Sequence, residues 1–319
     1  MSIFTWFIAF LLDLKLGDPQ SWPHPVRWIG ELISKTEAMI RSRCKTESGL
    51  QLGGIVLWLV VVGSAWLASY WVLRLAFGIQ FWLGCAVEVW MIYTTLATRS
   101  LSDAADQVYQ ALKKGDLAES REKLSWIVGR DTAELAPPQI ARAVTETVAE
   151  NTVDGVIAPL FFLMLGGAPL AMAYKAVNTL DSMVGYKTPK FQAIGMFSAR
   201  ADDVANWIPA RLGWLLLALA AWWLKLDYRQ ALHIGWRDRY QHKSPNSGWS
   251  EATVAGALGV RLGGPNTYFN QRVEKPWIGD ERREITLDDM TKTTQLMKVA
   301  SVMALLLFAL LYSLFNLMI

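Results

Sequence analysis

Four long apolar stretches determine what this chain can fold into. A helix needs about 20 apolar residues to cross the hydrocarbon of a bilayer, and these stretches are long enough or nearly so. Of all residues, 53% are hydrophobic and 16 are Trp, more than a soluble enzyme carries. The pattern predicts a polytopic membrane helix bundle whose spans cover residues 52–77, 81–97, 207–224 and 299–319.

A further apolar stretch, residues 156–176, contains helix-breaking residues at its centre. Gly166, Gly167 and Pro169 interrupt the helical hydrogen bonding that a straight span requires. The stretch is either a kinked span or a re-entrant segment, and the second needs surrounding protein or a water-filled cavity. Residues 3–12 are apolar but short for a span.

Three polar segments separate the apolar stretches, and each contains several Lys and Arg. Because positive charge is enriched in cytoplasmic loops, we expect these segments on the cytoplasmic side. No strand pattern or internal repeat is found, and no basic tract with interleaved aromatics indicates nucleic-acid binding. The sequence predicts an all-α fold, a single integral membrane domain over residues 1–319 with helical cytoplasmic segments at 13–51, 98–155 and 225–298.

Residues 98–155 begin with two predicted amphipathic helices, 99–114 and 117–128. Gly115 provides a C-terminal end for the first helix, and Asp116 provides an N-cap for the second.

Three carboxylates stand four residues apart in "TETVAENTVDGVIAPLFF". Glu146, Glu150 and Asp154 share one helix face, so their charges repel one another. We expect no basic partner beside them, and the following residues are apolar, where uncompensated charge is costly. A Mg²⁺ ion would remove the repulsion, because it prefers carboxylate oxygens. The alternative is a solvated acidic helix face.

Polar side chains also gather around the third predicted span. Lys175 begins a stripe of polar residues at helical spacing, and Asp202 and Asp203 precede the span at residue 207. Charged residues beside membrane segments indicate function, although either Asp alone is also suited to capping the helix.

Two more polar clusters contain histidine and arginine. His24 lies between Pro23 and Pro25, which predict an extended backbone there. The segment 236–265 is rich in Arg and Gly, a combination that receives phosphate groups, although its "SPNSG" is equally typical of a surface turn. The candidates from both clusters are His24, Arg27, Arg237, His242, Ser244, Asn246 and Arg261.

Taken together, the polar segments resemble the adenosylcobinamide-phosphate synthase family of cobalamin biosynthesis. Ser250 departs from the proline expected in many relatives. The resemblance covers almost the whole chain, in order, through "GDPQSWPHPVRWIG", "KLSWIVGRDT", "TETVAENTVDGVIAPLFF", "YKAVNTLDSMVGYK", "SARADDVANWIPARL" and "HKSPNSGWSEATVAGALGVRLGG".

The resemblance implies an amide ligase that depends on ATP and Mg²⁺. Such an enzyme joins adenosylcobyric acid, a corrinoid, to aminopropanol or aminopropanol phosphate. It implies a multi-pass protein among the lipids of the bacterial cytoplasmic (inner) membrane, with an active site facing the cytoplasm.

The resemblance also gives the polar residues roles. Glu146, Glu150 and Asp154 would share Mg²⁺ with nucleotide phosphates, and Asp202 and Asp203 would be the next candidates for the metal or for catalysis. The amine proton would pass to His24 or His242. The phosphates and the nucleotide would be held by Arg27, Arg130, Lys175, Arg237, Ser244, Asn246 and Arg261.

Two other functions remain open from the residues alone. An intramembrane Mg²⁺-dependent prenyl- or alcohol-phosphate transferase also uses Asp-rich helices, but it leaves the "SPNSG" cluster without a role. A transporter with a broken helix at residues 166–169 would need ion-binding carboxylates, but no repeated halves are found.

Overall fold

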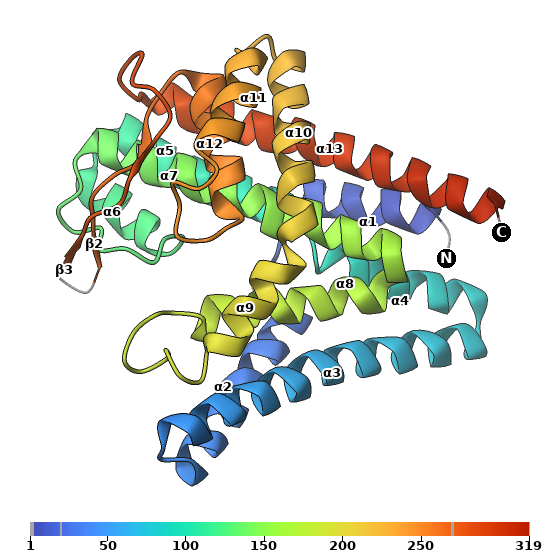
Figure 1. Cartoon of the computed structure of the whole chain (residues 1–319). Helices are drawn as coiled ribbons and strands as arrows, with labels where there is room; N and C mark the ends of the chain where they lie inside the picture. Colours follow the sequence, from blue (N-terminus) through green and yellow to red (C-terminus); the bar gives the residue numbers. More distant parts are fainter. Residues whose placement is uncertain (1–2, 20, 269–270, 319) are drawn as a thin grey trace. The chain divides into compact units, whose positions relative to one another are not determined.

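The computed structural model describes residues 3–19, 21–268 and 271–318, and these residues are mostly helical (Figure 1). Their packing divides the chain into two compact units. Unit 1 consists of Met1–Ala97, Ala158–Asn206 and Leu307–Ile319, and unit 2 consists of Thr98–Ile157 and Trp207–Leu306.

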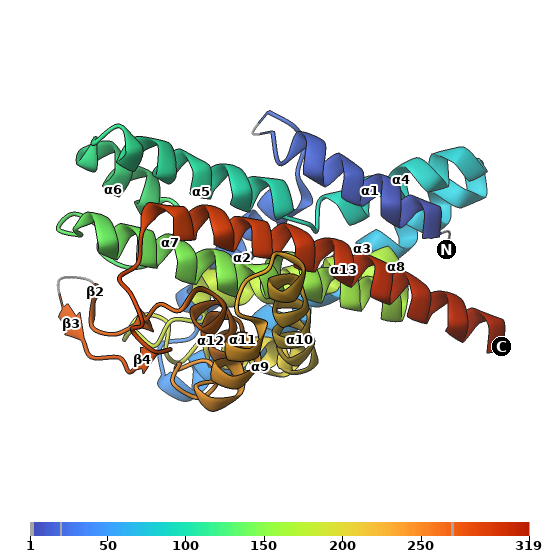
Figure 2. The same ribbon diagram turned by 90° about the horizontal axis from the view of Figure 1, so that it is seen from above.

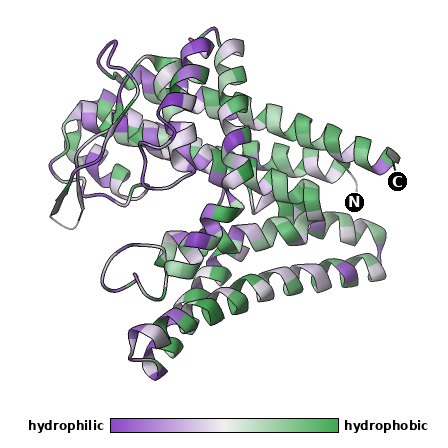
Figure 3. Cartoon of the chain, viewed as in Figure 1, coloured by the Kyte–Doolittle hydropathy of each residue, from purple (hydrophilic) through white to green (hydrophobic). Residues whose placement is uncertain are grey.

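Unit 1 contains a long helical hairpin. Helix α3 (Glu47–Ile79) and helix α4 (Phe81–Tyr93) are joined at Gln80 and pack against each other, as the sequence predicts. Thr46 caps α3 by accepting a hydrogen bond from the Gly49 N–H. Apolar residues cover α3 and α4 (Figure 3), and many are exposed, which suits contact with lipid tails.

The shorter helices of unit 1 complete its packing. Helix α3 packs against α8, and Gly54 on α3 lets the backbone of Ile194 approach so closely that a Cβ there would lie 2.2 Å from its oxygen. The remaining elements are α1 (Ile3–Leu16), α2 (Pro25–Arg43), α8 (Ala158–Val184), α9 (Met196–Ala205) and the last turns of α13 (Leu287–Met318).

Helix α8 reverses direction at the predicted break. Gly166 and Gly167 have non-helical dihedral angles, and Gly167 has a φ of 73°. The rings of Phe162 and Tyr174 stack with centroids 4.8 Å apart, whereas twelve residues of straight helix would rise about 18 Å. The two arms of α8 therefore lie side by side, as Figure 1 also shows. The reversal favours the re-entrant segment over the kinked span.

Four helical segments of the described chain are long and apolar enough to cross a membrane, or five if one bent pair forms a single span. The bent pair is α9 and α10 (Trp207–Trp223), whose axes differ by 47°. The last apolar stretch belongs to a helix that starts earlier than expected, at Leu287. This confirms the predicted all-α polytopic bundle. The predicted span at residues 207–224 passes only together with α9, whereas Pro137–Val184 passes although it contains the reversal of α8. The four segments are Glu47–Ile79, Phe81–Lys113, Pro137–Val184 and Leu287–Leu317.

Unit 2 is built around α5 (Thr98–Lys113), α6 (Leu117–Ser125) and α7 (Pro137–Thr152), which pack against one another (Figure 2). The two amphipathic helices are confirmed, with Gly115 in the left-handed region and Asp116 accepting from the Glu119 N–H. The core of this part is made of Ala105, Val108, Leu112, Leu124, Ile140, Ala141, Ala143, Val144, Val148, Met290 and Met297.

The expectation of no strands is wrong at one place in unit 2. Two antiparallel pairs form after α12, because glycines and a proline end the helix and four very short extended pieces find partners. They are β1 (Leu262–Gly263) with β4 (Trp277–Ile278), and β2 (Asn266–Tyr268) with β3 (Gln271–Val273).

Helices α11 (Tyr228–Arg237) and α12 (Ser247–Leu258) pack closely in unit 2. A Cβ at Gly256 would lie 2.3 Å from the Gln230 carbonyl oxygen, so only glycine allows this approach. The close packing fixes the N-terminus of α12, which carries part of the candidate site.

Candidate active site

Glu146 stands at the centre of a buried polar network in unit 2. Its side chain on α7 is 6% exposed, and it accepts hydrogen bonds from Arg130 and from the Gly263 N–H, the latter at 2.7 Å. Arg142 Nε lies 3.7 Å from Glu146 Oε1. The expectation that no basic partner stands beside these acids is therefore wrong. Arg142, four residues earlier on the same helix face, was overlooked.

The network holds Arg130 in one orientation. Arg130 donates to Glu146 and, through Nη1, to Asn266 Oδ1 at 2.8 Å. Asn266 in turn donates to the Gly264 carbonyl oxygen, and the Asp131 N–H donates to the carbonyl oxygen of Thr267. Residues of the "GRDT" and "RLGG" segments thus meet at Glu146. The guanidinium group of Arg130 is held in a fixed orientation, which is what phosphate binding requires.

Glu150 lies one turn after Glu146 and contacts a different segment. Ser247 Oγ donates to Glu150 Oε1 at 2.7 Å. Ser247 opens α12 after a turn in which the Asn246 N–H donates to Ser244 Oγ, and Arg211 donates to Asn246 Oδ1 at 3.1 Å. The turn predicted at "SPNSG" therefore ends a loop. It also places the Ser247 hydroxyl against Glu150, a candidate metal ligand.

A histidine and a third glutamate complete the network. His242 Nε2 lies 3.8 Å from Glu251 Oε1. Burial lowers the pKa of His242, so the imidazole is neutral at pH 7. Burial, together with the charges of Glu146 and Glu150, raises the pKa of Glu251 well above its usual range. Burial therefore favours the uncharged form of both groups next to the acidic helix.

Two arginines flank one aromatic ring beside the network. The guanidinium of Arg261 lies 3.9 Å from the centroid of Trp277, and that of Arg142 lies 5.0 Å from it. Arg261 also pairs with Glu281 at 2.8 Å. Contact with the same Trp277 ring therefore brings the two guanidinium groups together.

Asp154 lies beyond α7 in a π-helical turn, Val153–Ile157. Such turns interrupt α-helices mostly at functional sites. The turn shifts Asp154 away from the regular four-residue spacing that the sequence suggests. Across residues 3–19, 21–268 and 271–318, no three His, Cys, Asp or Glu side chains are grouped as a metal site. The magnesium role of Glu146, Glu150 and Asp154 stays a prediction.

Asp202 and Asp203 lie in unit 1, inside the last turns of α9, which ends just before α10. Neither is the N-cap of α10, so capping does not explain them. Asp202 Oδ2 accepts from Asn206, whose own Oδ1 accepts from the Tyr174 hydroxyl. Within the described chain, Asp202 Oδ1 is buried without a hydrogen-bond partner. A buried carboxylate with an unused oxygen is suited to receiving a cationic group.

The other candidates in unit 1 are Lys175 on α8, His24 and Arg27. The backbone at His24 is extended, as its two prolines predict. Its Nε2 lies 2.9 Å from Asp18 Oδ1, a contact whose angles are not those of a hydrogen bond. Arg27 donates to the carbonyl oxygens of Pro19 and Trp22 and so closes the loop before α2.

Arg237 belongs to a separate ion-pair group in unit 2. It forms a two-pronged pair with Asp238 and also contacts Asp280 at 2.9 Å. Burial alone would raise the pKa of Asp238, but the hydrogen bonds from Arg237 and the Gly279 N–H lower it. These contacts tie the end of α11 to the loop after β4.

The sequence predicted part of this network and missed part. Arg142 had a visible signal, since it stands four residues before Glu146 on one helix face. Asn266 and Trp277 gave no signal, because both act through contacts that only the folded chain makes.

Known proteins resemble this chain along almost its whole length. Residues 6–297 match the family model described as "CobD/Cbib protein". A cobalamin biosynthesis protein CobD of Photorhabdus laumondii is 67% identical over 311 residues, 98% of each chain. The CobD of Yersinia enterocolitica is 68% identical over 310 residues, covering 97% of this chain and 98% of that protein.

A third relative carries the other name of the family. The cobalamin biosynthesis protein CbiB of Salmonella typhimurium is 64% identical over 307 residues, 96% of each chain. No solved structure matches. The family resemblance of the six segments is confirmed: this chain belongs to the CobD/CbiB family, the adenosylcobinamide-phosphate synthases of cobalamin biosynthesis.

Proposed function

We propose that this protein joins adenosylcobyric acid to aminopropanol, or to aminopropanol phosphate, in an ATP- and Mg²⁺-dependent amide ligation at the cytoplasmic face of the inner membrane. The observation that carries the proposal is the convergence of two other family segments on two glutamates of a third. Glu146 bonds Arg130 and Gly263, and Glu150 bonds Ser247, although these partners lie up to 117 residues away in sequence.

The reaction needs an activated carboxylate. An oxygen of the corrinoid carboxylate attacks the γ-phosphorus of ATP, ADP leaves, and an acyl phosphate forms. The amine nitrogen then attacks the acyl carbon, inorganic phosphate leaves, and the nitrogen loses one proton. Charge stabilisation on the phosphoryl group and exclusion of water from the acyl phosphate are therefore the tasks of the site.

The arginines of unit 2 are suited to the phosphates. Arg130 is fixed by Glu146 and Asn266, and Arg142 and Arg261 flank Trp277. Preoriented guanidinium groups bind phosphate oxygens in pairs and lose little freedom on binding. In this arrangement Glu146 acts as the anchor of the cations.

Two of the three predicted carboxylates are enough to hold the magnesium ion of Mg-ATP. Mg²⁺ is usually held by one or two carboxylates together with substrate phosphates. Glu146 is already engaged by Arg130 and by Gly263, whereas Glu150 accepts a hydrogen bond from the neutral Ser247 hydroxyl. We assign the metal to Glu150 and Asp154. When bound, the ion neutralises charge on the phosphate oxygens.

The proton of the attacking amine needs an acceptor that is neutral at pH 7. His242 meets this requirement because burial lowers its pKa, and the negative charges of Glu150 and Glu146 favour the imidazolium that forms. The Ser244 N–H donates to Nδ1 in the resting arrangement, so this bond must open before Nδ1 accepts a proton.

The proposal is tested with protein purified in detergent. The protein is incubated with ATP, Mg²⁺, adenosylcobyric acid and either amine, and the products are separated and weighed by mass spectrometry. We expect the amide of one amine, formed only when ATP and Mg²⁺ are both present. Corrinoid acid that stays unchanged with both amines, in protein whose melting temperature shows that it is folded, would refute the ligase.

A further inference from the structure

Two arginines and three tryptophans form a patch where helices α10, α11 and α12 of unit 2 pack together. The guanidinium group of Arg239 lies 3.9 Å from the ring centroid of Trp236 and 5.6 Å from that of Trp249. The guanidinium group of Arg211 lies 4.4 Å from the centroid of Trp207 and 5.0 Å from that of Trp249. These five residues are called the arginine–tryptophan patch. Its two cations contact one shared ring, so their charges repel each other.

Neither cation of the patch is neutralised by an acid in the described part of the chain. Arg211 donates to the carbonyl oxygen of Trp207 at 2.8 Å and to Asn246 Oδ1 at 3.1 Å. Arg239 donates to the carbonyl oxygen of Trp236. All three acceptors are uncharged, and both arginines are only partly exposed. The patch therefore carries two positive charges that are available to an anion from outside the chain.

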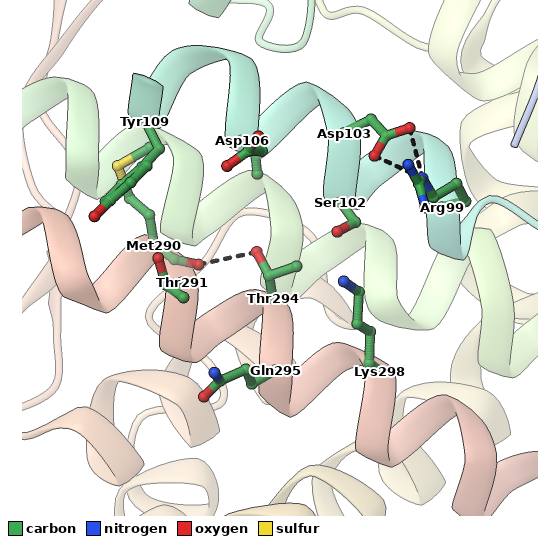
Figure 4. A pocket seen from close by; sticks show the side chains of 11 residues that line it. Arg99, Ser102, Asp103, Asp106, Tyr109, Met290, Thr291, Thr294, Gln295 and Lys298 are labelled. Atoms are coloured by element: carbon green, nitrogen blue, oxygen red, sulfur yellow. Dashed lines mark hydrogen bonds and ion pairs between the residues drawn. The ribbon is translucent and has the colours of Figure 1, made fainter. Parts of the chain in front are cut away.

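Two other arginines of unit 2 show the contrast. Arg99 pairs with Asp103 at 2.7 Å in a polar pocket between α5 and α13 (Figure 4). Arg237, the last residue of α11, pairs with Asp238 at 2.6 Å. An anion would gain little at either of these arginines, because an acid already holds the guanidinium group.

An exposed apolar stripe on α10 runs through the position of Arg211. Its apolar members recur with Arg211 at intervals of three and four residues, so they share one helix face. Each is about half exposed; they are Ile208, Leu215, Leu219 and Trp222. The stripe is about 21 Å long. Since α10 also belongs to the bent pair that is a candidate membrane span, the stripe is suited to acyl chains.

The tryptophan rings of the patch indicate the same environment. Trp207 is 56% exposed and Trp236 is 54% exposed, whereas Trp249, which both cations contact, is buried. Exposed tryptophans are enriched at the level of the lipid headgroups, where basic residues meet the phosphate groups. A soluble anion would leave the apolar stripe uncovered, but a lipid covers the stripe and the cations together.

We propose that the arginine–tryptophan patch binds the phosphate group of an anionic phospholipid whose acyl chains lie along the stripe of α10. The phosphate oxygens accept hydrogen bonds from both guanidinium groups, and the negative charge relieves the repulsion between them. A zwitterionic headgroup is less suited, because its ammonium group would meet two cations. The inference rests on the patch and the stripe and is independent of the ligation proposed above.

The test measures lipid binding to the full-length protein in detergent by native mass spectrometry. Phosphatidylglycerol and phosphatidylcholine with identical acyl chains are titrated separately, and ATP is titrated as a soluble phosphate compound. We expect phosphatidylglycerol to bind about tenfold more tightly than phosphatidylcholine, the order of one charge-assisted hydrogen bond. Arg211→Gln and Arg239→Gln should each remove most of this preference and leave the binding of phosphatidylcholine unchanged.

Arg229→Gln is the matched control on the same helix. Arg229 also lies over an aromatic ring, 5.9 Å from the centroid of Tyr228, but it stands near the start of α11, seven residues before Trp236. The substitution removes the same charge and should leave the preference for phosphatidylglycerol intact. Melting temperatures show which variants are folded. If Arg211→Gln loses its fold together with the bond to Asn246, Arg239→Gln alone decides the test.

A preference for phosphatidylglycerol that falls in the folded patch variants and persists in Arg229→Gln supports the inference. Equal binding of the two lipids overturns it, as does a preference that persists in either folded patch variant. An equal loss in Arg229→Gln shows a general effect of net charge and also overturns it. Binding of ATP that falls in the patch variants, while the binding of phosphatidylglycerol does not, makes the patch a nucleotide site and refutes the lipid.

Discussion

Phe162 and Tyr174 stack at 4.8 Å although twelve residues separate them in sequence. The stack requires α8 to turn back at Gly166 and Gly167, where the helical dihedral angles are lost. A segment that turns back leaves the membrane on the side from which it entered. The polar stripe of α8 after the turn then faces the same side as the start of the segment.

This reversal predicts the result of cysteine labelling. With Cys44 and Cys85 replaced by Ser, Thr188→Cys and Lys243→Cys should both react with a membrane-impermeant maleimide only from the cytoplasmic side. The measurement is labelling of inside-out and right-side-out vesicles. Reaction of Thr188→Cys from the opposite side would show that α8 crosses the membrane as a complete span.

Glu150→Gln should abolish ligation and leave the protein folded. The amide still accepts the Ser247 hydrogen bond through its oxygen, but it lacks the charge that a metal ligand needs. Activity is measured over a range of Mg²⁺ concentrations, with the melting temperature as the control. Near-normal turnover at low Mg²⁺ would remove the metal role of Glu150.

Glu146→Gln should behave differently, because it leaves two cations without their charge partner. Breaking a buried pair costs about 3–5 kcal/mol of folding free energy, and Arg130 and Arg142 both pair with Glu146 in a buried place. We expect a clear loss in the free energy of unfolding. A variant as stable as the wild type would show that the network does not anchor the arginines.

Arg130 and Arg237 were both predicted to bind phosphate, but their alanine variants should affect different quantities. Arg130→Ala should raise the KM for ATP, because the loss of one charge-assisted hydrogen bond costs roughly 1.5–3 kcal/mol. Arg237→Ala should lower the melting temperature with little change in that KM, since Arg237 is engaged by Asp238 and Asp280. The reverse result would make Arg237 the phosphate ligand.

Asp202→Asn and Asp203→Asn test whether unit 1 takes part in the chemistry. Both residues lie inside α9, so no cap is lost. If the carboxylates receive the incoming ammonium or a metal, at least one variant should lose a hundredfold in activity, about 2.7 kcal/mol. Two fully active variants would refute the catalytic role.

Glu251 should make stability depend on pH. Its pKa in the folded protein lies well above the ordinary value of 4.5, so the folded state binds more protons than the unfolded state above that pH. Stability is therefore highest below about pH 4.5 for this group and falls as pH rises toward the folded pKa. Glu251→Gln should flatten the melting temperature over this window. An unchanged pH profile would contradict the buried, proton-binding Glu251.

The sequence predicted the features that depend on residues close together in the chain. Apolar length predicted the candidate spans near residues 52–77, 81–97 and 299–319, whereas residues 207–224 reach that length only with α9. The Gly-Gly-Ala-Pro sequence predicted the break in α8, and Asp116 and the prolines around His24 predicted local conformation. Helical spacing also placed Glu146 and Glu150 on one face. The partners of these residues could not be predicted, because Asn266, Ser247 and Gly263 reach them only through tertiary packing.

The central claim is that ATP activates the corrinoid carboxylate as an acyl phosphate, and transfer of an oxygen isotope tests it most directly. Adenosylcobyric acid labelled with ¹⁸O in its reacting carboxylate is converted in ordinary water, and the released phosphate is weighed by mass spectrometry. The account predicts inorganic phosphate that carries one ¹⁸O atom for each amide formed, together with ADP. Amide formation with unlabelled phosphate, or with the label in AMP, would contradict it.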